Sequence, residues 1–425
     1  MTQDTRRWTA CLLGVLAVLP VAMVSSALAA PVVPSHDSEV LERLRSTTAA
    51  DPRSREIREL QADLARQPDR RDLAVRVARL YLLKNREESD PRYLGYAQAA
   101  LARWWSEERA PSDVVVLRAT IRQSRHEFEA AMGDLSRLVA VEPGNAQGWL
   151  TLAAIQQVRG DYAAAGRSAM ALFQLADEEV AVTCAAITAS LNGEAAKGAN
   201  LLQRTLGRNP HPDPAVRVWA LTALAEITGR LGRDHDAEAR FKEALALQDR
   251  DGYLLGAYAD FLLDVGRPEE VLSLLREETR NDNLLLRLGL AEQGVHPTHA
   301  SLSKEVTSLR ARFEASRLRG DTAHQREEAR FTLHLLHQPR PALDLARANW
   351  QVQREPADVR ILLEAAIATG DQPALHTVRE WLQTSRLEDV HLDRLLASRP
   401  GSQAAVSPRV EGASSLAGSL SSRRF

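Results

Sequence analysis

The sequence is poor in cysteine, in aromatic residues and in long apolar runs. It contains two cysteines in 425 residues, and aromatic side chains make up 5% of the chain. Because Cys11 lies in an N-terminal apolar segment, Cys184 alone remains for the folded part, which excludes an intramolecular disulfide there. No later stretch approaches 18 apolar residues, so the sequence predicts no second membrane-spanning helix. The folded part must be held together by side-chain packing.

An excess of charge of one sign is also lacking. The chain has 54 Lys and Arg against 56 Asp and Glu, a formal net charge of -2. A broad nucleic-acid surface needs a basic excess, so we expect no nucleic-acid partner. Hydrophobic residues at 44% and charged residues at 26% are typical of a folded, soluble protein. The chain holds 4 Lys against 50 Arg, which is typical of a GC-rich bacterial gene.

The N-terminus has the three parts of a secretory signal. Arg6 and Arg7 precede an apolar run over residues 11–24, and Ala27-Leu28-Ala29 offers small residues for a signal peptidase. A retained anchor is the alternative, but the run is shorter than the roughly 20 residues of a spanning helix, and Pro20 interrupts it. We therefore expect residues 1–29 to be removed and residues 30–54 to form a linker. The mature protein is then periplasmic or secreted, with no integral membrane segment.

A repeat with a period of about 34 residues runs through the middle of the chain. Four pairs of like residues have this separation: Ala119 with Ala153, Phe128 with Tyr162, Ala131 with Ala165, and Leu138 with Leu172. Residues 218–251 and 252–285 repeat the same spacing. A period of this length is typical of an array of helical hairpins.

The repeat resembles the tetratricopeptide repeat, a helix-turn-helix of about 34 residues. Trp149-x2-Leu152-Ala153 matches the opening of its pattern, Ala237-x3-Phe241 the middle, and Pro143 and Pro210 the end. The resemblance covers about three quarters of the mature chain. It implies an all-α solenoid of antiparallel helix hairpins, wound as a right-handed superhelix.

Small residues mark the contacts that such hairpins need. Alanines at 119, 153, 186, 225 and 259 would let the two helices of one unit approach, and Ala131, Ala165, Gly198 and Ala237 would do so against the next unit. Glycines at 160, 193, 232 and 266 fall at the turns, where a positive φ is needed.

The repeats divide the chain. We expect tetratricopeptide-like repeats over residues 55–290, degenerate helical repeats over 291–397 and a disordered tail over 398–425. Within the degenerate part we predict a helix over 301–318, a turn at Gly320, a hairpin over 342–370 and one more helix around Trp381. Residues 89–105 carry four aromatics and depart from the pattern. They form either an N-terminal cap or an inserted recognition feature.

The chain shows no pattern of a catalytic site. It lacks G-x-S-x-G, H-E-x-x-H, a Walker A loop and G-x-G-x-x-G, so we predict no enzyme and no cofactor. His334 and His337 lie three residues apart, and on one helix face they could hold a metal ion. The alternative is a packed helix end, where histidine suits the helix dipole.

By resemblance, the first helix of each unit lines a concave groove. The groove positions are Asp72, Arg79, Gln123, Gln157, Trp219, Glu226, Arg230, Tyr253, Asp260 and Asp264. From these, we select as binding residues Arg79, Gln123, Gln157, Trp219, Arg230, Tyr253 and Asp260, with the two aromatics as anchors. The alternative for the two aromatics is that they pack between repeats. We expect a non-catalytic scaffold that binds a protein or peptide partner. The alternative is a periplasmic accessory factor that binds a metal or small ligand through its C-terminal helical part.

Overall fold

The fold was obtained as a computed structural model of the whole chain. It describes residues 36, 52–88, 90–209, 212–248, 251–297, 304–318, 320 and 323–397. The predicted signal peptide and C-terminal tail lie outside these residues, as do Pro210 and most of the linker. The chain divides into two compact units, residues 1–54 and 55–425, and the helical hairpins belong to the second.

The described residues form helices joined by short turns, with no strand among them. The array begins with α2 (Pro52–Arg66), α3 (Arg71–Glu88), α4 (Arg92–Ala100) and α5 (Ala102–Trp105). Ten helices follow, which we call the regular hairpins: α6 (Ser112–Ser124), α7 (Phe128–Val141), α8 (Ala146–Arg159), α9 (Tyr162–Leu172), α10 (Glu178–Ser190), α11 (Ala195–Leu206), α12 (Pro214–Arg230), α13 (Asp234–Leu247), α14 (Gly252–Asp264) and α15 (Pro268–Leu275).

The remaining helices, which we call the C-terminal hairpins, continue the series. They are α16 (Asp282–Val295), α17 (Lys304–Leu318), α18 (Gln325–His334), α19 (Pro339–Val352), α20 (Pro356–Thr369), α21 (Gln372–Ser385) and α22 (Val390–Ala397). Three predictions are confirmed, namely the helix that ends at residue 318, the hairpin of α19 and α20, and the helix that contains Trp381. The boundary drawn between residues 290 and 291 falls inside α16. The all-α solenoid of antiparallel hairpins is confirmed.

Short polar side chains begin many of these helices. Asn145 accepts a hydrogen bond from Gly148 N at the start of α8, and Asp161 accepts one from Ala164 N at the start of α9. Such caps satisfy amide groups that have no partner within the helix. Where such a cap is present, it sets the residue at which the helix starts.

Residues with positive φ end the first helix of several hairpins. Gly160 has a φ of 79° and Gly193 a φ of 77°, values that strain residues with a side chain. Positive φ is shared by Gly232, Gly266, Gly320 and Gly370. The predicted turn positions are thereby confirmed. His126, which lies one repeat period before Gly160, has a φ of 60° and stacks on Phe128.

The small residues lie at close helix contacts, as predicted, but one assignment is corrected. A Cβ on Gly198 would lie 2.8 Å from the carbonyl oxygen of Ala186, and a Cβ on Gly229 would lie 3.7 Å from the Cβ of Ala237. Both contacts join the two helices of one hairpin. The sequence predicts contacts of Gly198 and Ala237 with the next unit, but the structure places both where the second helix crosses the first helix of its own hairpin.

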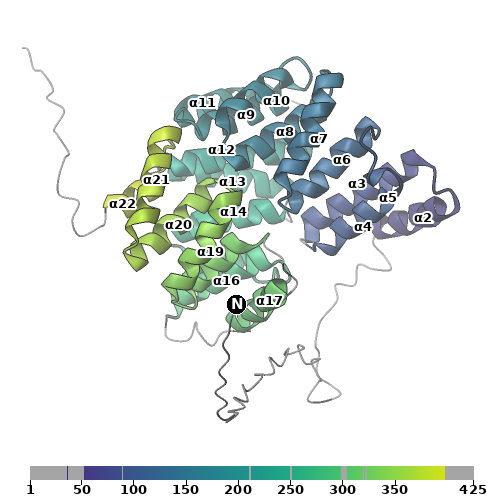
Figure 1. Cartoon of the computed structure of the whole chain (residues 1–425). Coiled ribbons are helices and arrows are strands. Elements are labelled where there is room, and N and C mark those ends of the chain that lie inside the picture. The colour runs from purple at the N-terminus through teal and green to yellow at the C-terminus, as the bar shows by residue number, and fades with distance from the viewer. Residues whose placement is uncertain are drawn as a thin grey trace, which may run out of the picture. The chain divides into compact units, whose positions relative to one another are not determined.

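The C-terminal hairpins return to the regular hairpins. Arg354 N donates to the carbonyl of Val158 at 2.8 Å, and the Tyr162 hydroxyl donates to the carbonyl of Arg354 at 3.1 Å. Further along, Glu388 accepts from Ala195 N at 2.7 Å. In Figure 1, α19 to α22 accordingly lie beside the helices of the regular hairpins. The solenoid therefore contacts itself across more than 190 positions of sequence.

Residues 89–105 supply the second helix of the first hairpin. The rings of Tyr81, Tyr93 and Tyr96 lie within 5.3–6.2 Å of one another by centroid, between α3 and α4. Trp104 is buried, and Trp105 packs against the same core. Most of the aromatic surface of this segment thus serves packing, and Tyr96 stays 50% exposed.

None of the described helices combines the length and the apolar composition that crossing a bilayer requires.

Candidate binding site on the first helices of the hairpins

The first helices of successive hairpins present their polar side chains to one another. Gln157 of α8 donates to the hydroxyl of Thr188 in α10 at 2.7 Å, and Arg230 of α12 donates to Ser190 of α10 at 2.8 Å. We call the surface formed by α8, α10, α12, α14, α16, α18 and α20 the inner face. Both bonds involve a residue, Gln157 or Arg230, that was predicted to line a groove.

Ion pairs continue this pattern between α14 and the C-terminal hairpins. Asp260 pairs with Arg287 of α16 and, at 2.6 Å, with Arg330 of α18. Asp264 pairs with Arg360 of α20 at 2.8 Å. Burial alone would raise the pKa of Asp260, but the two guanidinium groups outweigh it and hold the pKa well below its ordinary value. One helix is therefore joined to three others through two carboxylates.

Arg360 also belongs to a second group of charges. It donates to Glu364 at 2.9 Å, and Glu364 lies 2.8 Å from His334 Nε2. Burial opposes ionisation of Glu364, but its hydrogen bond with His334 and the charge of Arg360 lower the pKa to about 2. Glu364 is thus a charged acceptor at neutral pH.

Arg326 lies among three carboxylates. It pairs with Glu327 at 2.9 Å, Glu355 at 2.8 Å and Asp358 at 3.4 Å. Burial raises the pKa of Asp358 to about 6, against the opposing charge of Arg326. Asp358 also closes a capping box with Glu355 at the start of α20, so this cluster fixes how α20 begins.

Glu226 and Tyr253 form a contact of the inner face that is a hydrogen bond and not an ion pair. The Tyr253 hydroxyl lies 3.0 Å from both carboxylate oxygens of Glu226. Burial raises the pKa of Glu226 to about 7, although Arg230 and the Tyr253 hydroxyl act in the opposite direction. Tyr253 is nonetheless 60% exposed, which makes it an accessible aromatic side chain on the inner face.

The structure brings some of the selected binding residues together and leaves others apart. Arg230, Tyr253 and Asp260 lie on the adjacent helices α12 and α14, within electrostatic range of Glu226. Trp219 is half-buried and packs against the core beneath α8 and α10. In the described structure, no hydrogen bond or ion pair joins the side chains of Arg79 or Gln123 to this group.

His334 and His337 do not share a helix face, contrary to the expectation behind the metal site. His334 is the last residue of α18, and His337 lies beyond it with a φ of 53°. His334 contacts Glu364, whereas His337 Nε2 lies 3.1 Å from Gln293. The described residues contain no group of three or more His, Cys, Asp or Glu side chains placed to hold a metal ion.

Cys184 is buried within α10, and burial raises the pKa of its thiol to about 12. A thiol with such a pKa is protonated at neutral pH and is a poor nucleophile. Cys184 is a small residue of the hydrophobic core.

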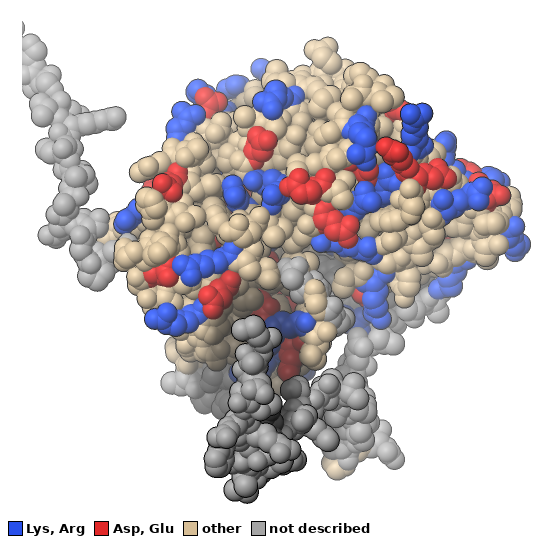
Figure 2. Space-filling view, in the orientation of Figure 1, with Lys and Arg blue, Asp and Glu red and all other residues tan. Residues whose placement is uncertain are grey.

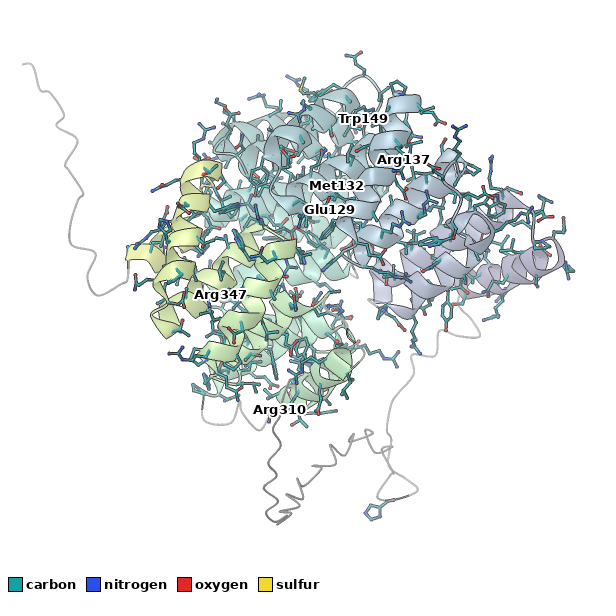
Figure 3. All side chains as sticks on the ribbon, viewed as in Figure 1. Glu129, Met132, Arg137, Trp149, Arg310 and Arg347 are labelled. Carbon is teal, nitrogen blue, oxygen red and sulfur yellow. The ribbon has the colours of Figure 1, made fainter. Side chains whose placement is uncertain are left out.

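The second helices carry a different kind of charge. Arg137 of α7 pairs with Asp134 at 2.8 Å, and Arg347 of α19 pairs with Asp371 at 2.6 Å (Figure 3). Both arginine side chains are exposed. On the face drawn in Figure 2, basic and acidic residues alternate over the described surface without a large area of one sign. The acidic partners of the two arginines differ, because Asp134 is buried and also pairs with Arg118 at 2.7 Å.

Several residues of the inner face were not selected from the sequence. Glu226 and Asp264 were recognised as groove positions only, and the arginines at 287, 326, 330 and 360 were missed because the repeat register was not carried past residue 285. One signal was present: Arg326 and Arg360 are one repeat period apart, as are Arg330 and Glu364. Their pairing with α14 could not be read from that spacing.

No family model matches the chain, and no curated protein sequence matches it. The solved structures with a likeness to the chain include the three that follow. A tetratricopeptide repeat protein from Parabacteroides merdae is 11% identical, with a TM-score of 0.36, over 73% of this chain and 98% of its own. Cut9, in its complex with Hcn1, is 13% identical, with a TM-score of 0.36, over 73% and 52%.

The tetratricopeptide domain of P58(IPK) is 13% identical, with a TM-score of 0.20, over 76% of this chain and 95% of its own. The chain spans about half the length of Cut9, at 52%. Likeness at this level indicates nothing about partners. What the inner face can bind is argued below from its own residues.

Proposed function

We propose that this protein is an exported, non-catalytic interaction protein that binds a protein or peptide partner on its inner face. Stacked helical hairpins provide an extended face for such a partner. The observation that carries the proposal is Tyr253, a large aromatic side chain that stays 60% exposed where neighbouring groups are paired. Exposed aromatic residues of this kind dominate the binding energy of interfaces.

The test is capture of the partner in the native cell envelope. The protein would be cross-linked in place, recovered and compared by mass spectrometry with a Tyr253→Ala variant. Tyr96→Ala is the matched control, because Tyr96 is 50% exposed but lies on α4, outside the inner face. We expect one dominant protein that is lost in Tyr253→Ala and kept in Tyr96→Ala. A protein retained equally by both variants would contradict binding at the inner face.

The export of the protein is part of the proposal and rests on the signal pattern in residues 1–29. N-terminal sequencing of the protein from a periplasmic extract is expected to read from Ala30. A protein that keeps Met1 and stays with the cytoplasmic fraction would contradict export.

A further inference from the structure

The strongest unassigned feature of the inner face is the pair formed by Glu226 and Tyr253. Within the described part of the chain, no Lys, Arg or His nitrogen comes within ion-pairing distance of Glu226; its hydrogen-bond partner is the Tyr253 hydroxyl. Other inner-face carboxylates, such as Asp260 and Asp264, hold arginine partners. A carboxylate offers about four acceptor positions, so Glu226 keeps most of its capacity free.

We propose that Glu226 and Tyr253 form the binding site for a basic side chain, that of an arginine or lysine of the partner. This inference rests on the proposed function and names the chemistry that the partner presents. The carboxylate would accept charge-assisted hydrogen bonds from the cation. The exposed ring of Tyr253 would contact its face, as aromatic rings do with guanidinium and ammonium groups.

The charges around the pair favour a cation. Among the described residues, the carboxyl groups in the charged clusters named above are those of Glu226, Asp260, Asp264, Glu327, Glu355, Asp358 and Glu364. The guanidinium groups are those of Arg230, Arg287, Arg326, Arg330 and Arg360. Carboxyl groups thus outnumber guanidinium groups, and a bound cation reduces that excess.

An anionic ligand fits the same place less well. Arg230 is the guanidinium closest in sequence to Glu226, and one of its nitrogens already donates to Ser190. Its Nε is buried without a hydrogen-bond partner in the described structure, so a ligand has no access to it. An incoming carboxylate would also meet Glu226 and Glu355, whose charges act on this site.

The site carries its own pH signature. The groups that act on Glu226 are Arg230 of its own helix, Tyr253 and Asp260 of α14, and Glu355 before α20; α10 contributes the hydroxyl of Ser190, which does not titrate. With a pKa of about 7, Glu226 is mostly protonated at pH 6 and mostly charged at pH 8. Because a cation binds the charged form, its affinity is expected to rise about tenfold over that interval.

The test measures, by isothermal titration calorimetry, the affinity of the purified protein for acetyl-Ala-Arg-Ala-amide. This tripeptide has uncharged ends, so its arginine carries its only charge. The control peptide carries citrulline in place of arginine, which keeps the shape and removes the charge. The protein variants are Glu226→Gln, Tyr253→Ala and, as a control of equal charge change, Glu243→Gln, which pairs with Arg240 on α13. Circular dichroism confirms that each variant is folded.

The arginine peptide is expected to bind about tenfold more tightly than the citrulline peptide. Glu226→Gln should remove that preference and flatten the rise from pH 6 to pH 8, Tyr253→Ala should weaken binding several-fold, and Glu243→Gln should change neither. Equal binding of both peptides, an unchanged Glu226→Gln variant or an affinity that falls with pH would overturn the assignment.

These outcomes are separate from those of the capture experiment. A Tyr253-dependent partner together with no preference for the arginine peptide leaves the proposed function standing and removes the cation site. A Glu226-dependent preference for the arginine peptide without any captured protein would support the cation site and contradict the proposed function.

Discussion

The regular hairpins and the C-terminal hairpins solve the same packing problem differently. The first helices of the regular hairpins are joined by hydrogen bonds, such as Gln157 to Thr188 and Tyr253 to Glu226, and by the ion pair of Arg217 with Glu179 at 3.1 Å. The C-terminal hairpins are joined to α14 by ion pairs, such as Arg330 with Asp260 and Arg360 with Asp264. The backbone of Arg354, between α19 and α20, also forms hydrogen bonds with Val158 of α8 and with the Tyr162 hydroxyl of α9.

The difference teaches that this solenoid is not one-dimensional. In an ordinary repeat array each unit contacts only its neighbours, and stability is a sum of local terms. Here Tyr162 and Leu191 of the regular hairpins lie in one core cluster with Val359 and Leu375 of the C-terminal hairpins. A substitution that destabilises the regular hairpins should therefore also destabilise the C-terminal hairpins, and the reverse.

The largest effect is expected from Asp260→Ala, which leaves Arg287 and Arg330 without their shared carboxylate. Breaking a buried pair costs about 3–5 kcal/mol, and partial exposure reduces our expectation to about 2–3 kcal/mol of unfolding free energy. Glu243→Ala, which breaks an exposed pair, should cost less than about 1 kcal/mol. Urea denaturation of both variants measures the difference, and equal losses would show that α14 is not held by the C-terminal hairpins.

Substitutions at two glycines distinguish the cost of local backbone strain from the cost of a clash between the regular hairpins and the C-terminal hairpins. Gly193 and Gly266 both have positive φ, but a Cβ on Gly193 would lie 2.7 Å from the Cβ of Arg386, whereas a Cβ on Gly266 has open space around it. Gly266→Ala should cost about 1 kcal/mol through backbone strain alone. Gly193→Ala should cost about 1–3 kcal/mol more through the clash. Thermal denaturation with similar losses for both would argue against docking of the C-terminal hairpins at this turn.

Glu226→Gln is expected to stabilise the protein in a pH-dependent way. The folded pKa of Glu226 is about 7 against an ordinary value of 4.5, so the folded state holds the proton more tightly and loses stability as pH rises between these values. The amide removes this penalty, and we expect a gain of about 1–2 kcal/mol at pH 8 and little at pH 5. Urea denaturation at the two pH values checks the sign. A gain that is larger at pH 5 would contradict it.

The smallest effect concerns a single hydrogen bond between the halves. Tyr162→Phe removes the hydroxyl that donates to the carbonyl of Arg354 and should cost about 1 kcal/mol. Tyr258→Phe, whose hydroxyl lies 3.5 Å from Glu238 within the regular hairpins, should cost less than about 0.5 kcal/mol. Hydrogen exchange at α20 should quicken in the first variant only. Unchanged exchange there would mean that this bond does not couple the halves.

Much of the fold could be predicted from spacing because its determinants are local. The glycines at 160, 193, 232 and 266 stand where a chain reversal needs positive φ, and Ala186 opposes Gly198 because two helices of one hairpin must nearly touch. His126 takes the same positive-φ conformation although it is not a glycine, so its residue type does not predict the turn.

The binding face could be predicted only in outline. Position in the repeat placed Tyr253, Arg230 and Asp260 on the inner face, where the structure has them. The same rule chose Trp219, which is half-buried against the core, because position in the repeat does not distinguish an exposed ring from one that packs between hairpins. The rule also failed for His334 and His337, since the end of α18 falls between them.

The period, the helix pairs and their turns follow from the sequence alone, since each depends on residues that are near one another in the chain. The balance of charge follows from the composition. Only the tertiary structure decided which groove residues are paired and which are free. That outcome depends on how far each hairpin rotates against the last, and small rotations add along the array until Arg330 and Arg360 reach α14. Glu226 keeps free acceptor positions beside the Tyr253 hydroxyl because no arginine among the described residues comes within ion-pairing distance of it.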